Sequence, residues 1–182
     1  DVCSSDLVEC QNNIPILKKI DEKTIKTDIK KPTNILIEGD NYHALQVLNY
    51  THTGQIDVIY IDPPNNTGNK DFKYNDSFID KEDGYRHSKW LNFMNKRLRL
   101  AHNLLKNDGV IFISIGKDEL SQLSLLVKNI FGEDNYLDML PREQKAGSDQ
   151  GTYFSPQLDY IVVATKNKNI LDKYYICLIY EY

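Results

Sequence analysis

The run Asp62-Pro63-Pro64-Asn65 contains the residues whose types and spacing are best suited to chemistry. Asp62 follows an apolar segment, residues 57–61, which predicts a buried strand, and a residue that precedes proline avoids the helical region. Pro63 and Pro64 have a fixed φ and no N–H. The Asp62 carboxylate and the Pro63 carbonyl are therefore expected to form two rigid hydrogen-bond acceptors at a strand end.

Two neighbouring acceptors suit a primary amine, because that group offers two N–H donors. The exocyclic amine of a nucleobase fits this description. Hydrogen bonds to both hydrogens can bias the nitrogen toward tetrahedral geometry, so that its lone pair attacks an aligned electrophile. A plain strand-ending turn would also explain Asp62-Pro63-Pro64, and these residues alone leave both interpretations open.

The elements that must position this run alternate between strands and amphipathic helices, which predicts a parallel α/β sheet with its chemistry at the carboxyl ends of the strands. Asp40 is placed to cap one helix, and Gly109 to end another in the left-handed conformation. A long polar loop is predicted at 65–85. The predicted strands are 34–38, 57–61, 110–115 and 160–165, and the predicted helices are 41–50, 88–106 and 117–131.

Composition is that of a globular protein: 182 residues, 41% apolar, 26% charged and a net charge of −4. The longest apolar run, residues 110–115, is too short to span a membrane. The three cysteines, Cys3, Cys10 and Cys177, show no metal-ligand spacing. We therefore predict no metal and no membrane partner, and we expect a reducing, cytoplasmic location.

Basic residues gather between positions 70 and 99 although the whole chain is acidic. Acidic residues are interspersed among them, so a solvated face of mixed charge and a phosphate-facing surface are both open. The basic residues are Lys70, Lys73, Lys81, Arg86, Lys89, Lys96, Arg97 and Arg99.

The segment IDPPNNTGNKDFKYND and the following SKWLNFMNKRLRLAHNLLKNDGVIFISI resemble the permuted (beta) class of amino-DNA methyltransferases, especially the modification subunit of type III restriction–modification systems. NILIEGDNYHALQVL upstream and ELSQLSLLVKNIFGEDNY downstream fit the same pattern. The resemblance covers residues 34–136 strongly and 137–168 loosely. It implies an incomplete Rossmann-like methyltransferase sheet, with a partial catalytic domain at residues 34–168.

The resemblance also implies an activity: transfer of a methyl group from S-adenosylmethionine to the N6 amine of an adenine flipped out of double-stranded DNA. Asp62 and the Pro63 carbonyl would hold the amine, with Pro64 and Asn65 completing the motif. Asp40 would lie near the cofactor's adenosine, and a helix N-cap explains it equally well. The implied partners are a restriction subunit and, at full length, a second copy, in a bacterial or phage-type setting.

Two residues depart from the family pattern. Asn65 stands where the family has a tyrosine that stacks on the extruded base, and Gly116 stands where it usually has an acid. Base–aromatic stacking is worth about 1–3 kcal/mol, so its full loss would weaken base holding roughly 5- to 150-fold. Each replacement can arise from one nucleotide change, which leaves read error, gene decay and true divergence open.

The glycine-rich cofactor loop of the family lies after its recognition region, and no Gly-x-Gly occurs in this chain. We therefore expect truncation at both ends and no methyl transfer by this chain alone. Residues 1–33 are expected to form an irregular arm. Residues 1–7 are expected to be non-native, because they can be back-translated into DNA that looks like the end of a sequencing adapter. Residues 169–182 are expected to form a truncated or frameshifted tail. A non-catalytic remnant that binds DNA or a partner subunit remains open. An N4-cytosine methyltransferase is also open, although that activity usually has serine in place of Asp62.

Overall fold

The computed structural model describes residues 15–25, 34–74, 77–143 and 158–171. The expectations for residues 1–7, and for most of the arm and the tail, lie outside these ranges. The elements in chain order are η1 (Asp21–Lys23), α2 (Asn41–Thr51), β1 (Ile56–Ile61), β2 (Asn69–Tyr74), β3 (Ser77–Asp80), α3 (Arg86–Leu104), β4 (Leu105–Ile115), α4 (Leu120–Phe131), η2 (Glu133–Asn135), β5 (Tyr136–Glu143), β6 (Leu158–Thr165) and η3 (Lys168–Ile170).

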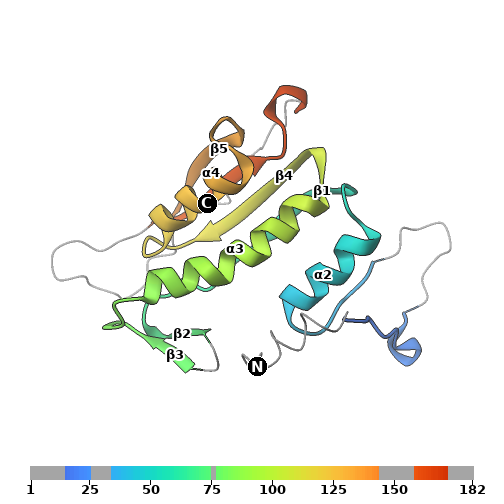
Figure 1. The fold of residues 1–182 in the computed structure, drawn as a ribbon, viewed down its shortest axis with the longest axis horizontal. Helices are drawn as coiled ribbons and strands as arrows, with labels where there is room; N and C mark the ends of the chain where they lie inside the picture. The colour runs from blue at the N-terminus through green and yellow to red at the C-terminus, as the bar shows by residue number, and fades with distance from the viewer. Residues whose placement is uncertain (1–14, 26–33, 75–76, 144–157, 172–182) are drawn as a thin grey trace.

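The main sheet has the strand order β1-β4-β6-β5 (Figure 1). β1 and β4 are parallel, with Ile59 opposite Ile111 and Ile61 opposite Ile113. β6 runs antiparallel to both β4 and β5. The predicted α/β class is confirmed, but an entirely parallel sheet was wrong. The reason is that α4 carries the chain from β4 to a parallel β5 two positions away in the sheet, and β6 then runs between them in the opposite direction.

The core lies between this sheet and α3 and α4, which pack side by side on one face of it (Figure 1). Trp90, Met94 and Leu98 recur at helical spacing on α3 and are at most 2% exposed. They pack against alternate residues of β4, including Ile111 and Ile113. Since burial of one such side chain contributes about 1.5–3 kcal/mol, this stripe fixes α3 firmly on the sheet.

Residues 34–38, predicted as a strand, have no strand conformation. Ile35 and Leu36 are 71% and 95% exposed. None of the described strands pairs with this segment, and an unpaired extended segment leaves its backbone groups to water. The predicted strand was therefore wrong for the described part of the chain.

Gly109 does not end α3, because the helix stops at Leu104 and Leu105 is already extended and fully buried. Gly109 lies inside β4, where an added Cβ would meet the Ile56 carbonyl oxygen and the Leu105 side chain at 3.0 Å. The sequence signal for glycine was real, but its cause is a close backbone approach within the sheet.

The predicted 65–85 loop contains a short antiparallel hairpin, β2 with β3, apart from the main sheet (Figure 1). Phe72 and Ile79 bury its inner side, at 3% and 4% exposure. Phe72 packs edge-on against Phe93 of α3, with the ring centroids 5.2 Å apart. Within the described residues, no helix is long and apolar enough to cross a membrane.

Candidate active site at the carboxyl end of β1

Asp62 directly follows β1, at the edge of the sheet where the parallel strands β1 and β4 both end. Its side chain is exposed and has no hydrogen-bond partner among the described residues. The backbone carbonyl of Pro63 likewise accepts no hydrogen bond from them. Both acceptors that the sequence predicts are thus available to a ligand.

The three residues after this pair are each anchored to a different element. Trp90 Nε1 of α3 donates to the Pro64 carbonyl at 2.7 Å. Gly116 N, just past β4, donates to Asn65 Oδ1, also at 2.7 Å. Asn66 Nδ2 donates to Glu119 Oε1, at the start of α4, at 2.5 Å. The segment is therefore held from three directions immediately after its two open acceptors.

Trp90 is a core residue, because its side chain is fully buried. The same side chain also fixes the loop through its indole N–H, a role that helical spacing alone does not reveal. A buried indole usually finds such a partner. Trp90 therefore links the hydrophobic core directly to Pro64.

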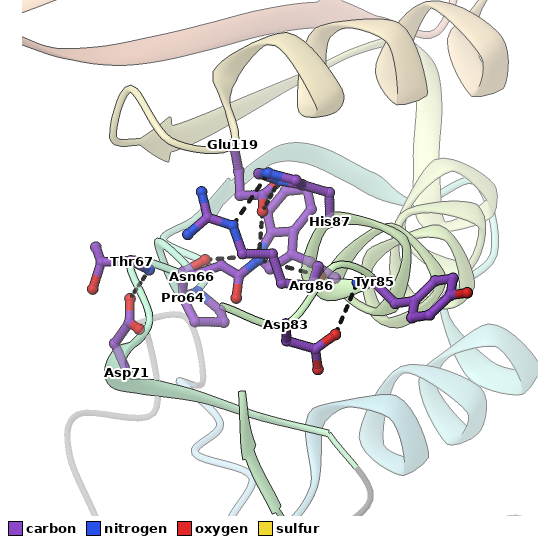
Figure 2. Close-up of polar contacts among 10 residues, drawn as sticks. Pro64, Asn66, Thr67, Asp71, Asp83, Tyr85, Arg86, His87 and Glu119 are labelled. Atoms are coloured by element: carbon purple, nitrogen blue, oxygen red, sulfur yellow. Dashed lines mark hydrogen bonds and ion pairs between the residues drawn. The ribbon is translucent and has the colours of Figure 1, made fainter. Parts of the chain in front are cut away.

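A partly buried polar cluster lies beneath the loop and comprises Asn66, Arg86, His87 and Glu119 (Figure 2). Asn66 and Glu119 are fully buried. His87 Nδ1 lies 2.7 Å from Glu119 Oε1, and His87 Nε2 accepts from Arg86 Nε at 3.2 Å. Because Nε2 accepts, Nδ1 carries the proton and donates to Glu119. Burial raises the pKa of the Glu119 carboxyl, and the hydrogen bonds from Asn66 and His87 partly oppose that rise.

Asp40 caps α2, as the sequence predicts, by accepting from Tyr42 N at 2.8 Å on Oδ1. Its Oδ2 lies 3.4 Å from Arg97 Nη2 of α3. Burial lowers the pKa of Arg97, and the neighbouring Asp40 opposes that shift. Both ends of the Asp40 carboxylate thus have a structural partner, while a role toward a cofactor stays a prediction.

Residues on one face of α3 contact both the loop after β1 and Asp40 at the start of α2. Trp90 holds the Pro64 carbonyl, and Arg97 holds Asp40. These two residues are seven positions apart, which places them almost in line and about 10 Å apart along the helix axis. α3 therefore sets the spacing between the loop after β1 and the start of α2.

Several of the basic residues between positions 70 and 99 have acidic or polar partners. Lys89 Nζ lies 2.6 Å from Asp83 Oδ2, and Arg97 pairs with Asp40. These contacts favour a structural role for part of the basic cluster. Among the described residues, no group of three or more His, Cys, Asp or Glu side chains could hold a metal ion.

The sequence analysis did not identify Asn66, His87 or Glu119 as parts of the candidate site. Asn66 has a left-handed φ of 54° and lies directly after the predicted motif. Its position next to Asn65 was the available signal. The pairing with Glu119, 53 positions later, has no local signature.

A family model described as DNA methylase (N6_N4_Mtase) matches residues 56–181. The chain is 40% identical over 142 residues to the "probable type III restriction-modification enzyme HindVI Mod subunit" of Haemophilus influenzae. The aligned region covers 76% of this chain and 18% of that protein. It is 36% identical over 165 residues to the type III EcoPI Mod subunit of Escherichia phage P1. That match covers 78% of this chain and 26% of the phage protein. The chain thus spans about a fifth to a quarter of these curated relatives.

Among solved structures, the fold is similar to TTHA0409 from Thermus thermophilus, a presumed DNA modification methylase. The TM-score is 0.51 at 13% identity, over 73% of this chain and 53% of that one. A second structure of that protein, complexed with S-adenosyl-L-methionine, gives a TM-score of 0.50 at 12% identity, over 73% and 54%. These similarities support the fold alone. The match to the family model over residues 56–181 goes further: this chain belongs to the DNA methylase family.

Proposed function

We propose that this chain carries the substrate loop of an adenine-N6 DNA methyltransferase of the type III modification class. The observation that carries the proposal is local: two open acceptors, the Asp62 carboxylate and the Pro63 carbonyl, precede three residues that are each anchored. Such preorganisation lets hydrogen bonds act on a reacting group without reorganisation during the reaction. Membership of the DNA methylase family and likeness to type III Mod subunits support the same assignment.

In this proposal, Asp62 and the Pro63 carbonyl each accept one N–H of the adenine amine. The two hydrogen bonds orient the nitrogen lone pair away from both acceptors and toward the methyl donor. As the new nitrogen–carbon bond forms, one N–H proton must leave, and it already points at the Asp62 carboxylate. The loop thus contributes alignment and charge at the nitrogen.

The proposed cofactor, S-adenosylmethionine, would supply the methyl group as an electrophile; its sulfur–methyl bond would break and the bonding pair would remain on sulfur. Asp40 is the described residue proposed to contact its adenosine. The Asp40 side chain is 21% exposed, and each of its oxygens has one protein partner. A carboxylate oxygen has two lone pairs, so Asp40 keeps acceptor capacity for a donor on the cofactor.

The partners proposed for the whole protein are double-stranded DNA with a flipped adenine, a restriction subunit and a second copy of the chain, in the bacterial cytoplasm. The relatives' names identify those proteins as Mod subunits of type III restriction-modification enzymes, which supports a restriction subunit as partner. The other partners and the location are what the resemblance to that family implies. The main alternative within the same chemistry is the N4 amine of cytosine, because that group also offers two N–H donors.

The test is a transfer assay on a hybrid protein, with residues 34–168 replacing the matching segment of the EcoPI Mod subunit. Labelled S-adenosylmethionine and DNA of varied sequence are supplied, and the modified base is identified. We expect label on adenine N6 and its loss with Asp62→Ala. Label on cytosine N4 would support the alternative. A hybrid that folds and binds the cofactor but transfers nothing, or that ignores Asp62→Ala, would contradict the proposal.

A further inference from the structure

Glu119 is a fully buried acid at the start of α4, and its environment is unusual for that position. It occupies the N-cap of α4 but makes no side-chain capping bond. Its side chain turns inward, and Oε1 serves both Asn66 Nδ2 and His87 Nδ1 (Figure 2). Glu119 thus gives up helix capping in favour of contacts beneath the loop that follows β1.

Asn66 is the residue through which Glu119 reaches that loop. It lies directly after Asn65 and has a φ of 54°. A non-glycine residue in this region costs on the order of 1 kcal/mol, so surrounding contacts must hold it there. The contacts are the bond to Glu119 Oε1 and a second, at 3.3 Å, to the Arg86 carbonyl.

Some buried polar atoms of this cluster lack the hydrogen bonds that a purely stabilising network would provide. Among the described residues, Asn66 Oδ1, Arg86 Nη1 and Glu119 Oε2 are buried without a hydrogen-bond partner. Partly satisfied buried polar groups cost stability, and an apolar replacement of similar volume is often neutral or better. An acid retained at that cost points to a role in placing something.

We propose that Glu119 is a positioning residue for the Asp62–Pro63 acceptor pair, acting through Asn66. The inference rests on the proposed function in one respect: the group being positioned is the one that binds the nucleobase amine. Glu119 Oε1 fixes the side chain of Asn66, and Asn66 fixes the downstream end of the loop. With Pro64 held by Trp90, the directions of the Asp62 carboxylate and the Pro63 carbonyl are then determined.

Trp90 gives a direct readout of loop position, because it is the single tryptophan of the chain and its indole N–H is bonded to Pro64. Its emission spectrum and its indole N–H resonance report that contact without any catalysis. Adenosine affinity, measured by NMR titration, reports the acceptor pair itself. Loop position and substrate binding are thereby measured separately.

The informative comparison is Glu119→Gln against Glu119→Met. Glutamine keeps an acceptor oxygen for Asn66 and His87, whereas methionine has similar length and no comparable acceptor. We expect Glu119→Gln to keep the wild-type indole resonance. We expect Glu119→Met to shift it and to weaken adenosine binding roughly tenfold or more. Glu133→Met is the matched surface control, because the Glu133 side chain is 83% exposed.

A second variant covers the case in which Glu119→Met does not fold. Asn66→Asp keeps a residue type that tolerates the left-handed region. It replaces the amide that donates to Glu119 Oε1 by a carboxylate oxygen, so that two hydrogen-bond acceptors face each other. It should shift the indole resonance, and adding Glu119→Gln should reverse the shift by restoring a donor–acceptor pair.

The two proposals fail in different ways. If the wild-type chain binds adenosine and neither Glu119→Met nor Asn66→Asp moves the indole signal or the affinity, the positioning role is wrong and the proposed function stands. If the variants move the indole signal but the wild-type chain does not bind adenosine, the loop is positioned as inferred and the proposed function is wrong.

Discussion

Asn65 Oδ1 accepts the backbone N–H of Gly116 at 2.7 Å, so the two residues that the sequence resemblance marked as departures contact each other. A Cβ added to Gly116 would lie 3.0 Å from Asn65 Oδ1 and 3.3 Å from its Cγ. The short side chain at one position therefore fits the bare backbone at the other. This complementarity favours a coupled replacement over two unrelated sequence errors.

Asn65→Tyr tests the cost of the missing ring. The variant loses the bond to Gly116, worth about 0.5–1.5 kcal/mol, and regains a stacking surface worth about 1–3 kcal/mol per base. We expect slightly lower stability in urea and a roughly 5- to 150-fold gain in adenosine affinity by NMR titration. Asn65→Ala loses the bond without adding a ring and should show no gain; equal affinity in all three proteins would mean that stacking is not limiting.

A double-mutant cycle measures the coupling between Asn65 and Gly116. Gly116→Ala places a methyl group against the Asn65 amide, which must move by a few tenths of an ångström or rotate into solvent. We expect a loss of about 0.5–1.5 kcal/mol in the free energy of unfolding for the single variant, and almost none in an Asn65→Ala background. Additive losses would show that the contact is incidental.

Glu119 should make the chain less stable as pH rises. Burial raises its folded pKa above the ordinary value of 4.5, so the folded state holds the proton more tightly than the unfolded chain does. The contribution of Glu119 to stability is therefore greatest below pH 4.5. It is lost as pH rises through the folded pKa, and the loss levels off above that value. Asn66, His87 and Arg86 are the groups that oppose the rise in pKa.

Glu119→Gln removes this titration. The unfolding free energy of the variant, relative to wild type, should increase with pH above 4.5 and then level off. Urea titrations at a series of pH values measure it, with the exposed Glu133→Gln as the control. Parallel curves for the variant and the wild type would contradict the assignment.

His102 should make the chain less stable as pH falls. Burial, followed by the charges of Lys166 and Arg99, lowers its folded pKa below the ordinary 6.5. Its contribution to stability is complete above pH 6.5 and is lost as pH falls toward the folded pKa. His102→Phe keeps a ring against Phe131 and should flatten the acid side of the stability curve. Unchanged acid sensitivity in thermal unfolding would refute this.

The sequence predicts best where local signals are strong. Helical spacing of apolar residues located α2, α3 and α4, and the Asp-Pro-Pro run located the end of β1. β5 was missed because Pro141 argues against a strand, yet β5 lies at the edge of the sheet, where a missing N–H is tolerated. β2 and β3 were missed because they are short and mostly polar.

Long-range contacts explain the rest of what the sequence did not predict. The position of Asp62 at a strand end is predictable from the residues next to it in the chain. The hydrogen bond between Asn66 and Glu119 joins residues 53 positions apart and has no local signal. Direction within the sheet is equally non-local: the YIVVAT segment predicts a strand but not its antiparallel orientation against β4. The local sequence pattern thus locates the candidate site, and only the fold identifies the residues that hold it.

The most direct test of the central claim compares adenosine, N6-methyladenosine and N6,N6-dimethyladenosine, which offer two, one and no N–H donors, in titrations of the wild-type chain and of Asp62→Ala. A hydrogen bond to a charged group contributes about 1.5–3 kcal/mol. We predict that affinity falls roughly tenfold or more from adenosine to the dimethyl compound, and that Asp62→Ala removes most of this difference. Equal binding of all three nucleosides, unaffected by Asp62→Ala, would contradict the claim that this loop holds an exocyclic amine.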